Sequence, residues 1–288
     1  MKHIIFGGDG FVGRHLAERL VKEGEDVVVA DIVKSDLPHY GRVRFVHCDV
    51  TDLEAVQKVG IGADDMIYNM AAKMLSPLQV RAKRWEFFWP VNYYGAENIM
   101  KAMDAAGASR LVQFTTDMIY GHTVQSPQTE THPAKPLGEY GKSKWATEQL
   151  AMQWRKQGMN ISIFRPRLII GPGRLGILEK LFKLIDLNLP VPMIGSGKVP
   201  YQFISVFDCA EAARLAGRRA ERSLQPRLRQ SAVRARPARQ PDQARRFEVV
   251  PAADTGLCGQ ADAGFLRPDQ QADHGPGTVP DRRRNVRA

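Results

Sequence analysis

Tyr140 and Lys144 stand four residues apart in the run YGKSK (residues 140–144), a spacing that places both on one face of a helix. A lysine ammonium beside a phenol favours the phenolate, so we expect the pKa of Tyr140 to be lowered. Such a phenol serves as a general acid or base near neutral pH. Thr116 ends an apolar run upstream, where its hydroxyl can orient the oxygen whose proton Tyr140 handles. These three side chains are the predicted catalytic group; the alternative is a surface Tyr and Lys on a helix.

A glycine-rich run, GGDGFVG (residues 7–13), follows a short apolar segment and precedes a helical pattern of apolar residues. Strand, glycine turn and helix form the context that a dinucleotide-binding fingerprint requires. Glycine is needed because the turn is tight and the backbone must approach a pyrophosphate, which the helix N-terminus attracts. Gly10 and Gly13 complete GxGxxG when counted from Gly8 and GxxGxxG when counted from Gly7. Either spacing predicts a dinucleotide site, against the alternative of an ordinary glycine loop.

Asp31 ends the next apolar run, residues 27–30. A carboxylate at this point suits a ribose 2′-hydroxyl and repels a 2′-phosphate, so it favours NAD over NADP. Arg14 is the opposing signal for NADP, although we expect it to be exposed on the first turn of the helix. The expected cofactor is therefore NAD, with NADP second.

The composition is that of a globular protein without a membrane segment. The 288 residues are 43% hydrophobic, which is ordinary, and no apolar run is long enough to span a bilayer. The fingerprint starts so near Met1 that we expect no signal peptide. The cysteines are scattered and form neither a disulfide framework nor a zinc spacing: Cys48, Cys209 and Cys258. We expect a cytoplasmic protein without a metal site.

The net charge of +10 raises the question of a nucleic-acid partner. Its location argues otherwise, because fifteen Arg and only eight Asp and Glu follow Gly217. The rest of the chain is nearly balanced and has no basic helix with interleaved aromatic residues. We expect a small-molecule substrate, and neither a nucleic acid nor a membrane as partner.

Strand and helix patterns alternate up to residue 170. The predicted strands are 4–6, 27–30, 43–47, 66–68, 111–116 and 161–164, and the predicted helices follow the glycine loop, begin at Leu53, and span 91–106 and 140–156. Repeated βαβ units predict an α/β fold, a Rossmann-like doubly wound parallel sheet in a domain of residues 1–170. Ligands bind at the carboxyl ends of such strands, which is where the motifs fall.

The pattern changes after residue 170. A GPG turn (171–173), an amphipathic helix (176–187), a strand (202–206) and a helix (208–216) predict a small, incomplete C-terminal substrate lobe, 171–217. The Arg- and Pro-rich tail, 218–288, has no Ile, Met, Tyr, Trp or Lys and cannot bury enough apolar area to order itself. We expect a disordered tail or the product of a translational frameshift, because shifted GC-rich codons yield Arg, Pro, Ala and Gly.

Together these motifs resemble the extended short-chain dehydrogenase/reductase family, the NAD-dependent epimerase/dehydratase group, over about residues 2–216. The motifs are GxxGxxG at 7–13, Asp31, an NxAA-like run at 69–72, TTxxxYG at 115–121, YxxxK at 140–144, RP at 165–166 and GPG at 171–173. The resemblance implies an oxidoreductase with Thr116, Tyr140 and Lys144 as the catalytic set. It also implies a homodimer through the helices 91–106 and 140–156.

The resemblance also implies how the cofactor is held. Lys144 would bind the nicotinamide ribose, Asp49 and Val50 would lie near the adenine, and Ala71 and Ala72 near the cofactor backbone. The full predicted cofactor-binding set is Gly7, Gly10, Phe11, Val12, Gly13, Asp31, Asp49, Val50, Ala71, Ala72, Tyr140 and Lys144. Asn92 looks like a structural Asn of the family, or else is a simple helix residue.

Two departures from the family pattern bear on the reaction. The 4,6-dehydratases carry Thr-Asp-Glu where this chain has Thr116-Asp117-Met118, and a thioether cannot act as the base. Nucleotide-sugar members usually carry Arg-Asp at the position of Tyr201-Gln202, and that Arg binds the substrate diphosphate. The possible substitutes are Lys198, Arg167 and Arg174, each of which is otherwise a solvated charge.

The expected function is an NAD(P)-dependent epimerase or oxidoreductase that acts on a secondary alcohol or ketone of a nucleotide sugar. The alternatives are a hydroxysteroid-dehydrogenase-like enzyme, a 4,6-dehydratase, which Met118 disfavours, and a non-catalytic NAD-binding protein. An aromatic cluster either packs in the interior or lines the substrate mouth: Trp85, Phe87, Phe88 and Trp89.

Overall fold

A computed structural model describes residues 1–74, 83–124, 128–174, 177–190 and 202–223. All of them belong to one unit of the chain, Met1–Gln230. The tail from residue 224 onward, for which disorder or a frameshift is predicted, lies outside the described residues, as do Lys198 and Tyr201.

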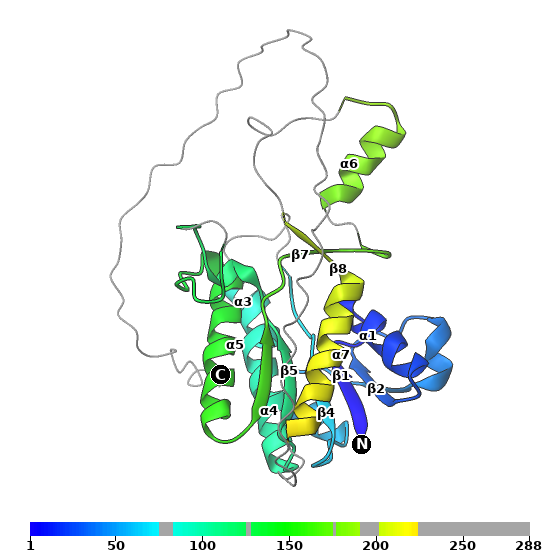
Figure 1. The fold of residues 1–288 in the computed structure, drawn as a ribbon, viewed down its shortest axis with the longest axis vertical. Helices are drawn as coiled ribbons and strands as arrows, with labels where there is room; N and C mark the ends of the chain where they lie inside the picture. The colour runs from blue at the N-terminus through cyan, green and yellow to red at the C-terminus, as the bar shows by residue number, and fades with distance from the viewer. Residues whose placement is uncertain (75–82, 125–127, 175–176, 191–201, 224–288) are drawn as a thin grey trace, which may run out of the picture. The chain divides into compact units, whose positions relative to one another are not determined.

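Six parallel strands form the central sheet (Figure 1). They are β1 (Lys2–Phe6), β2 (Asp26–Asp31), β3 (Arg44–His47), β4 (Met66–Asn69), β5 (Arg110–Phe114) and β6 (Asn160–Phe164), in the order β3-β2-β1-β4-β5-β6. Phe6 pairs with Asn69 and Asn69 with Gln113, so the carboxyl ends of the middle strands share one edge. This is the order of a doubly wound dinucleotide-binding sheet, and it confirms the predicted Rossmann-like fold.

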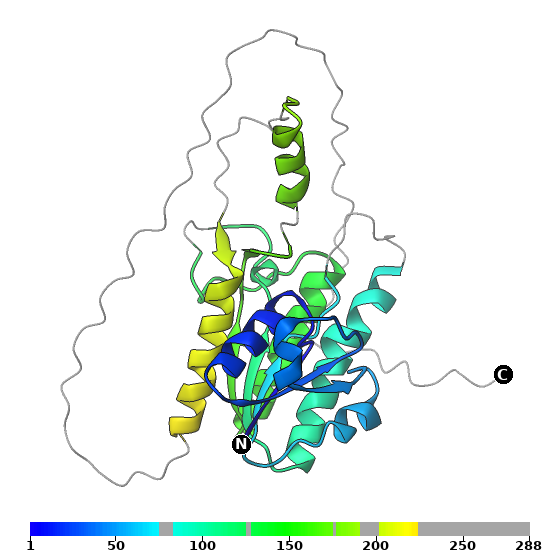
Figure 2. The same cartoon turned by 90° about the vertical axis from the view of Figure 1, so that its right-hand side faces the viewer.

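Helices cover both faces of the sheet (Figures 1 and 2). On one face lie α1 (Phe11–Lys22) and α7 (Val206–Ser223), and on the other α2 (Leu53–Lys58), α4 (Gly95–Ala105) and α5 (Gly138–Lys156). Successive residues of a strand point to opposite faces, so Ile4 and Phe6 pack toward one set of helices and Ile5 toward the other. Burial on both faces explains why the strands are continuous apolar runs instead of alternating ones.

The helix predicted over 91–106 consists of two elements, a π-helical turn η3 (Pro90–Tyr94) and α4. A further short helix, α3 (Arg84–Trp89), precedes them and was not predicted. Pro90 has no N–H with which to continue the α-helical ladder, and the wider turn follows it. This turn contains Asn92, which is buried.

The last described helix, α7, is longer than predicted and lies elsewhere. It packs on α1, β4 and β5, so it belongs to the Rossmann layer and not to a separate lobe. It continues beyond the predicted end at Ala216 to Ser223, since its buried apolar positions recur at helical spacing as far as Ala220. Gly217 permits the close approach, because a Cβ there would collide with the Tyr68 hydroxyl. The rest of the three-part domain division stays a prediction.

The remaining elements are short. A second sheet pairs β7 (Leu168–Ile170) with β8 (Phe203–Ser205) in parallel, and α6 (Ile177–Asp186) lies between them in the chain. Two 3-10 turns complete the described part, η1 (Pro38–Arg42) and η4 (Asp117–Ile119). Within the described residues, no helix has both the length and the apolar character needed to cross a bilayer.

Candidate active site

A cavity of about 180 Å³ opens at the carboxyl ends of β1, β2 and β4. Its lining is Gly7, Gly10, Asp31, Ile32, Cys48, Asp49, Val50, Met70, Ala71, Ala72, Lys73 and Val91. Seven of these residues were predicted as cofactor contacts. The other five were missed, although each is at most two residues from a predicted position except Val91. That residue joins the lining because the π-helical turn η3 carries it there.

The glycine loop is closed too tightly for side chains. Gly7 has φ +73°, and a Cβ on it would lie 2.5 Å from the backbone nitrogen of Ala71. A Cβ on Gly13 would lie 2.6 Å from the Cα of Gly8. Gly10 donates a 3.1 Å hydrogen bond to the carbonyl of Gly7. The close contacts at Gly7, Gly10 and Gly13 thus explain why glycine is needed at the three positions of the GxxGxxG motif.

The first turn of α1 does not line the cavity. Phe11 is half-buried with its ring against that of His15, and Val12 packs against the apolar layer between α1 and α7. Arg14 differs from the prediction of an exposed side chain, because it donates to the carbonyls of Asp9 (3.0 Å) and Gly10 (3.3 Å). The Arg14 guanidinium therefore stabilises the glycine loop through hydrogen bonds.

The carboxylate of Asp31 is oriented by backbone groups. Its Oδ1 accepts from the Ile32 nitrogen at 2.7 Å, and its Oδ2 accepts from the Asp9 nitrogen at 2.9 Å. Asp31 is half-buried at the cavity wall, where it presents the negative charge predicted to favour NAD.

The three predicted catalytic side chains meet at the carboxyl end of β5. Tyr140 and Lys144 lie on α5 and are 9% and 2% exposed, while Thr116 caps η4 just after β5. The Thr116 hydroxyl lies near the Tyr140 phenol and accepts a 3.3 Å hydrogen bond from the Met118 nitrogen. The Lys144 ammonium donates to the carbonyl of Phe114 at 3.3 Å.

The electrostatics at Tyr140 differ from the prediction. Burial raises the pKa of the Tyr140 phenol, and the hydrogen bond from Thr116 offsets this only in part. The expected lowering by Lys144 is absent because desolvation of the phenolate dominates and the ammonium is held on the Phe114 carbonyl. Burial also lowers the pKa of Lys144 to about 8.

A buried ion pair stands behind the catalytic group, and the sequence reasoning missed it. Glu148, with no exposed surface, accepts from the Thr115 hydroxyl at 2.6 Å and from the Arg165 guanidinium at 2.7 Å. Arg165 also donates to the Tyr120 hydroxyl at 2.8 Å. The available signal was the spacing, because Glu148 follows Lys144 by one further helical turn. The pair joins the ends of β5 and β6 to α5.

Asn92 joins the cofactor-facing loop to α5. Its Oδ1 accepts from the Lys73 nitrogen at 2.9 Å, and its Nδ2 donates to the Lys73 carbonyl and the Ser143 hydroxyl, each at 3.1 Å. The Thr147 hydroxyl donates to the Asn92 carbonyl at 2.7 Å. Of the two interpretations offered by the sequence, these contacts favour a structural Asn.

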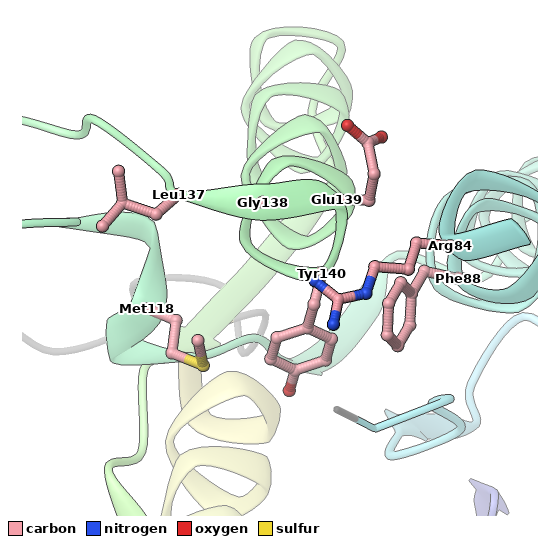
Figure 3. A pocket seen from close by; sticks show the side chains of 7 residues that line it. All are labelled: Arg84, Phe88, Met118, Leu137, Gly138, Glu139 and Tyr140. Carbon is pink, nitrogen blue, oxygen red and sulfur yellow. The ribbon is translucent and has the colours of Figure 1, made fainter. Parts of the chain in front are cut away.

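A second cavity, of about 260 Å³, adjoins Tyr140 (Figure 3). Its lining is Arg84, Phe88, Met118, Leu137, Gly138, Glu139 and Tyr140. Of the predicted aromatic cluster only Phe88 takes part; the rings of Trp85 and Trp89 stack on each other. Met118 stands in the wall, at the position where a dehydratase of the family carries its base.

The predicted substitutes for a phosphate-binding Arg have other contacts. Arg167 is ion-paired with Asp117, and Arg174 contacts the sulfur of Met74. Gln202, at the position of the family's Asp, is exposed. Arg167 and Arg174 therefore both have contacts within the protein, and neither is left without a partner to bind a diphosphate.

With this geometry in hand, comparison with known proteins gives the family. The model of the NAD dependent epimerase/dehydratase family matches residues 3–228. The chain belongs to this family. The match bears out the predicted resemblance, and it extends beyond Gly217, where the sequence pattern was taken to change.

Curated relatives of this epimerase/dehydratase chain include an uncharacterized protein, y4nG, of Sinorhizobium fredii. It is 30% identical over 210 residues, which are 73% of this chain and 51% of the relative. An N-acetyl-alpha-D-glucosaminyl-diphospho-ditrans,octacis-undecaprenol 4-epimerase of Escherichia coli is 27% identical over 199 residues, 67% of this chain and 56% of the relative. The chain thus spans little more than half the length of these two relatives.

A solved structure of the same fold is that of a Thermus thermophilus UDP-glucose 4-epimerase in complex with NAD. Its sequence is 26% identical, its TM-score is 0.62, and the match covers 75% of this chain and 74% of the other.

Proposed function

We propose that this chain is an NAD-dependent oxidoreductase of the epimerase type, acting on a secondary alcohol or ketone of a nucleotide sugar. The observation that carries the proposal is the meeting of Thr116, Tyr140 and Lys144 at the sheet edge that also holds the glycine loop. Family membership and the sugar-nucleotide activities named for its relatives support the substrate class.

The residues at the glycine loop fit NAD. The closed loop of Gly7, Gly10 and Gly13 leaves backbone surface for a pyrophosphate at the start of α1, and Asp31 offers a carboxylate to a ribose diol. When bound, NAD supplies a hydride acceptor and a positive charge. Lys144 is the residue to hold the ribose beside the reacting carbon.

Tyr140 is the proposed general acid and base. Its phenolate takes the proton of the substrate alcohol and becomes the phenol, and the nearby Thr116 hydroxyl orients the substrate oxygen. Because burial raises the pKa of Tyr140, the phenolate needs a positive charge nearby. Lys144, one helical turn away, is a cation on the same helix face.

The wall of the second cavity separates the alternatives. A 4,6-dehydratase needs a carboxylate base in this wall, and this chain has Met118 at that position. The apolar lining by Phe88, Met118 and Leu137 favours a hydroxysteroid-like alcohol as the second candidate. A non-catalytic NAD-binding protein is disfavoured, because it has no need of the buried catalytic group.

We also propose that the protein is cytoplasmic and that it forms a homodimer through η3–α4 and α5.

The test is a turnover assay on the purified full-length chain. NAD released on denaturation is measured first, and UDP-sugars and hydroxysteroids are then incubated with the protein. Sugar products are separated by chromatography and steroid oxidation is followed by NADH absorbance. Interconversion of two epimeric sugars supports the proposal, and oxidation of steroids alone would replace it by the second candidate.

A further inference from the structure

Arg84 extends into the cavity that the Tyr140 phenol lines. It is the first residue of α3, and Figure 3 shows its guanidinium reaching from that helix toward the Tyr140 ring, beside Phe88. The guanidinium and the Tyr140 ring therefore border the same cavity.

No described residue accepts a hydrogen bond from the Nε of Arg84. This nitrogen is buried, and the described part of the chain contains no ion pair to Arg84. Other arginines of the fold differ, since Arg165 is paired with Glu148 and Arg214 with Glu211. A buried N–H donor without a partner is costly, and a ligand acceptor removes that cost.

The carboxylate in the same lining is already engaged. Glu139 accepts from the Trp89 indole nitrogen at 2.9 Å and from the Lys142 ammonium at 3.2 Å. Among the described residues, the lining therefore presents a positive charge without an ion-pair partner at Arg84, in the same cavity as Tyr140. Such a charge attracts an anionic ligand group.

The size of the cavity decides where that anion lies on the ligand. Its volume of about 260 Å³ is below the roughly 300–1,000 Å³ of sites that hold drug-sized molecules. It admits one sugar ring, but not the ring together with its nucleoside diphosphate. The anionic group that meets Arg84 is then a substituent of the ring itself, and a carboxylate fits the planar fork of a guanidinium.

We propose that Arg84 binds a carboxylate on the sugar ring, so that the preferred substrate is a nucleotide hexuronate. This inference rests on the proposed function and adds a residue that sets its specificity. Arg84 acts on the ring by charge and hydrogen bonding, while the proton still moves through Tyr140.

The test compares two substrates that differ only at C6, UDP-glucuronate and UDP-glucose, with the full-length protein. We expect a higher kcat/KM for the uronate. Arg84→Gln should lower kcat/KM for the uronate roughly 10- to 100-fold and leave the neutral sugar within about 3-fold, since a charged hydrogen bond is lost only with the uronate. The kcat/KM of Arg84→Lys for the uronate should lie between those of the wild type and Arg84→Gln, because lysine keeps the charge but not the planar, two-pronged geometry of the guanidinium.

Controls separate this role from others. Lys83→Gln removes the neighbouring exposed cation and should change neither substrate. Thermal melting and NAD titration of Arg84→Gln report folding and the cofactor site. Equal losses for both sugars, or weaker binding of UDP alone to Arg84→Gln, would overturn the inference, because Arg84 would then support the fold or bind the diphosphate.

The proposed function and the inference fail in distinguishable ways. Turnover of the neutral sugar in preference to the uronate keeps the function and overturns the role of Arg84. If neither sugar is turned over, the proposed function fails, and calorimetric titration of UDP-glucuronate into the NAD-loaded protein decides the inference. Binding that depends on Arg84 supports it, and equal binding to wild type and Arg84→Gln overturns it.

Discussion

The backbone N–H of Asp9 donates a 2.9 Å hydrogen bond to Oδ2 of Asp31 and thereby joins the glycine-rich loop to the end of β2. The Asp9 carboxylate, 5% exposed, accepts from the Ser35 hydroxyl at 2.7 Å and from the Tyr40 hydroxyl. One residue of the fingerprint thus orients the cofactor-selecting carboxylate and holds the loop that follows it.

NAD should bind more tightly than NADP, because the Asp31 carboxylate would face the 2′-phosphate. Calorimetric titration of both cofactors measures the difference. Asp31→Ala should narrow it by weakening NAD binding and relieving the repulsion of NADP. Equal affinities in the wild-type protein would remove Asp31 from this role.

Asp9→Ala should destabilise the protein by about 1–3 kcal/mol, because it leaves the half-buried Tyr40 hydroxyl and the Ser35 groups without their acceptor. Urea unfolding measures the loss. Tyr40→Phe is the matched control, which removes one donor and keeps the Ser35 contacts, so its effect should be smaller. A stability unchanged in Asp9→Ala contradicts the account of this cluster.

Tyr140→Phe should lower turnover at least about 100-fold while NAD affinity stays near the wild-type value, since only the transferable proton is lost. Steady-state kinetics and NAD titration on the same preparation measure both. Retained turnover would mean that another group handles the proton.

Lys144 links stability to pH. Burial lowers the pKa of Lys144 to about 8 from an ordinary 10.5. Between these values the unfolded chain holds a proton that the folded chain has lost, so the contribution of Lys144 to the free energy of unfolding rises with pH over this window. At pH 7 the folded protein carries the full cost of a buried ammonium.

Lys144→Met should therefore be more stable than wild type at pH 7, by on the order of 3 kcal/mol, although catalytically impaired. The difference should fade toward pH 10. Urea unfolding at both pH values measures it, and Lys142→Met, which removes an exposed lysine of the same helix, should show no such pH dependence. A variant less stable than wild type at pH 7 contradicts the predicted sign.

Limited trypsin digestion should spare α7 and remove most of the chain beyond Ser223, where the composition predicts no ordered structure. Two arginines of α7, Arg214 and Arg218, are both paired with Glu23. The remaining core should bind NAD and dimerise through η3–α4 and α5. Mass spectrometry and size-exclusion chromatography measure these outcomes, and a monomeric core would contradict the proposed interface.

The sequence by itself determined the sheet, the glycine loop and the spacing of Tyr140 and Lys144. These features depend on short-range periodicity, since apolar runs, helical repeats and glycine turns are local properties of the chain. The predicted end of the last helix at Ala216 was wrong because another local property of the sequence was misleading. The abrupt rise in arginine concealed a buried apolar stripe that continues to Ala220, and Arg218 of this helix is ion-paired with Glu23 at the end of α1.

Only the tertiary structure decided what surrounds these residues. The pKa of Tyr140 is raised because α5 buries it, and burial arises from contacts between segments far apart in the chain. The Glu148–Arg165 pair and the place of Asn92 likewise join segments that no local pattern relates. Arg84 stands in an unremarkable stretch of sequence, and it meets Tyr140 because α3 and α5 pack side by side.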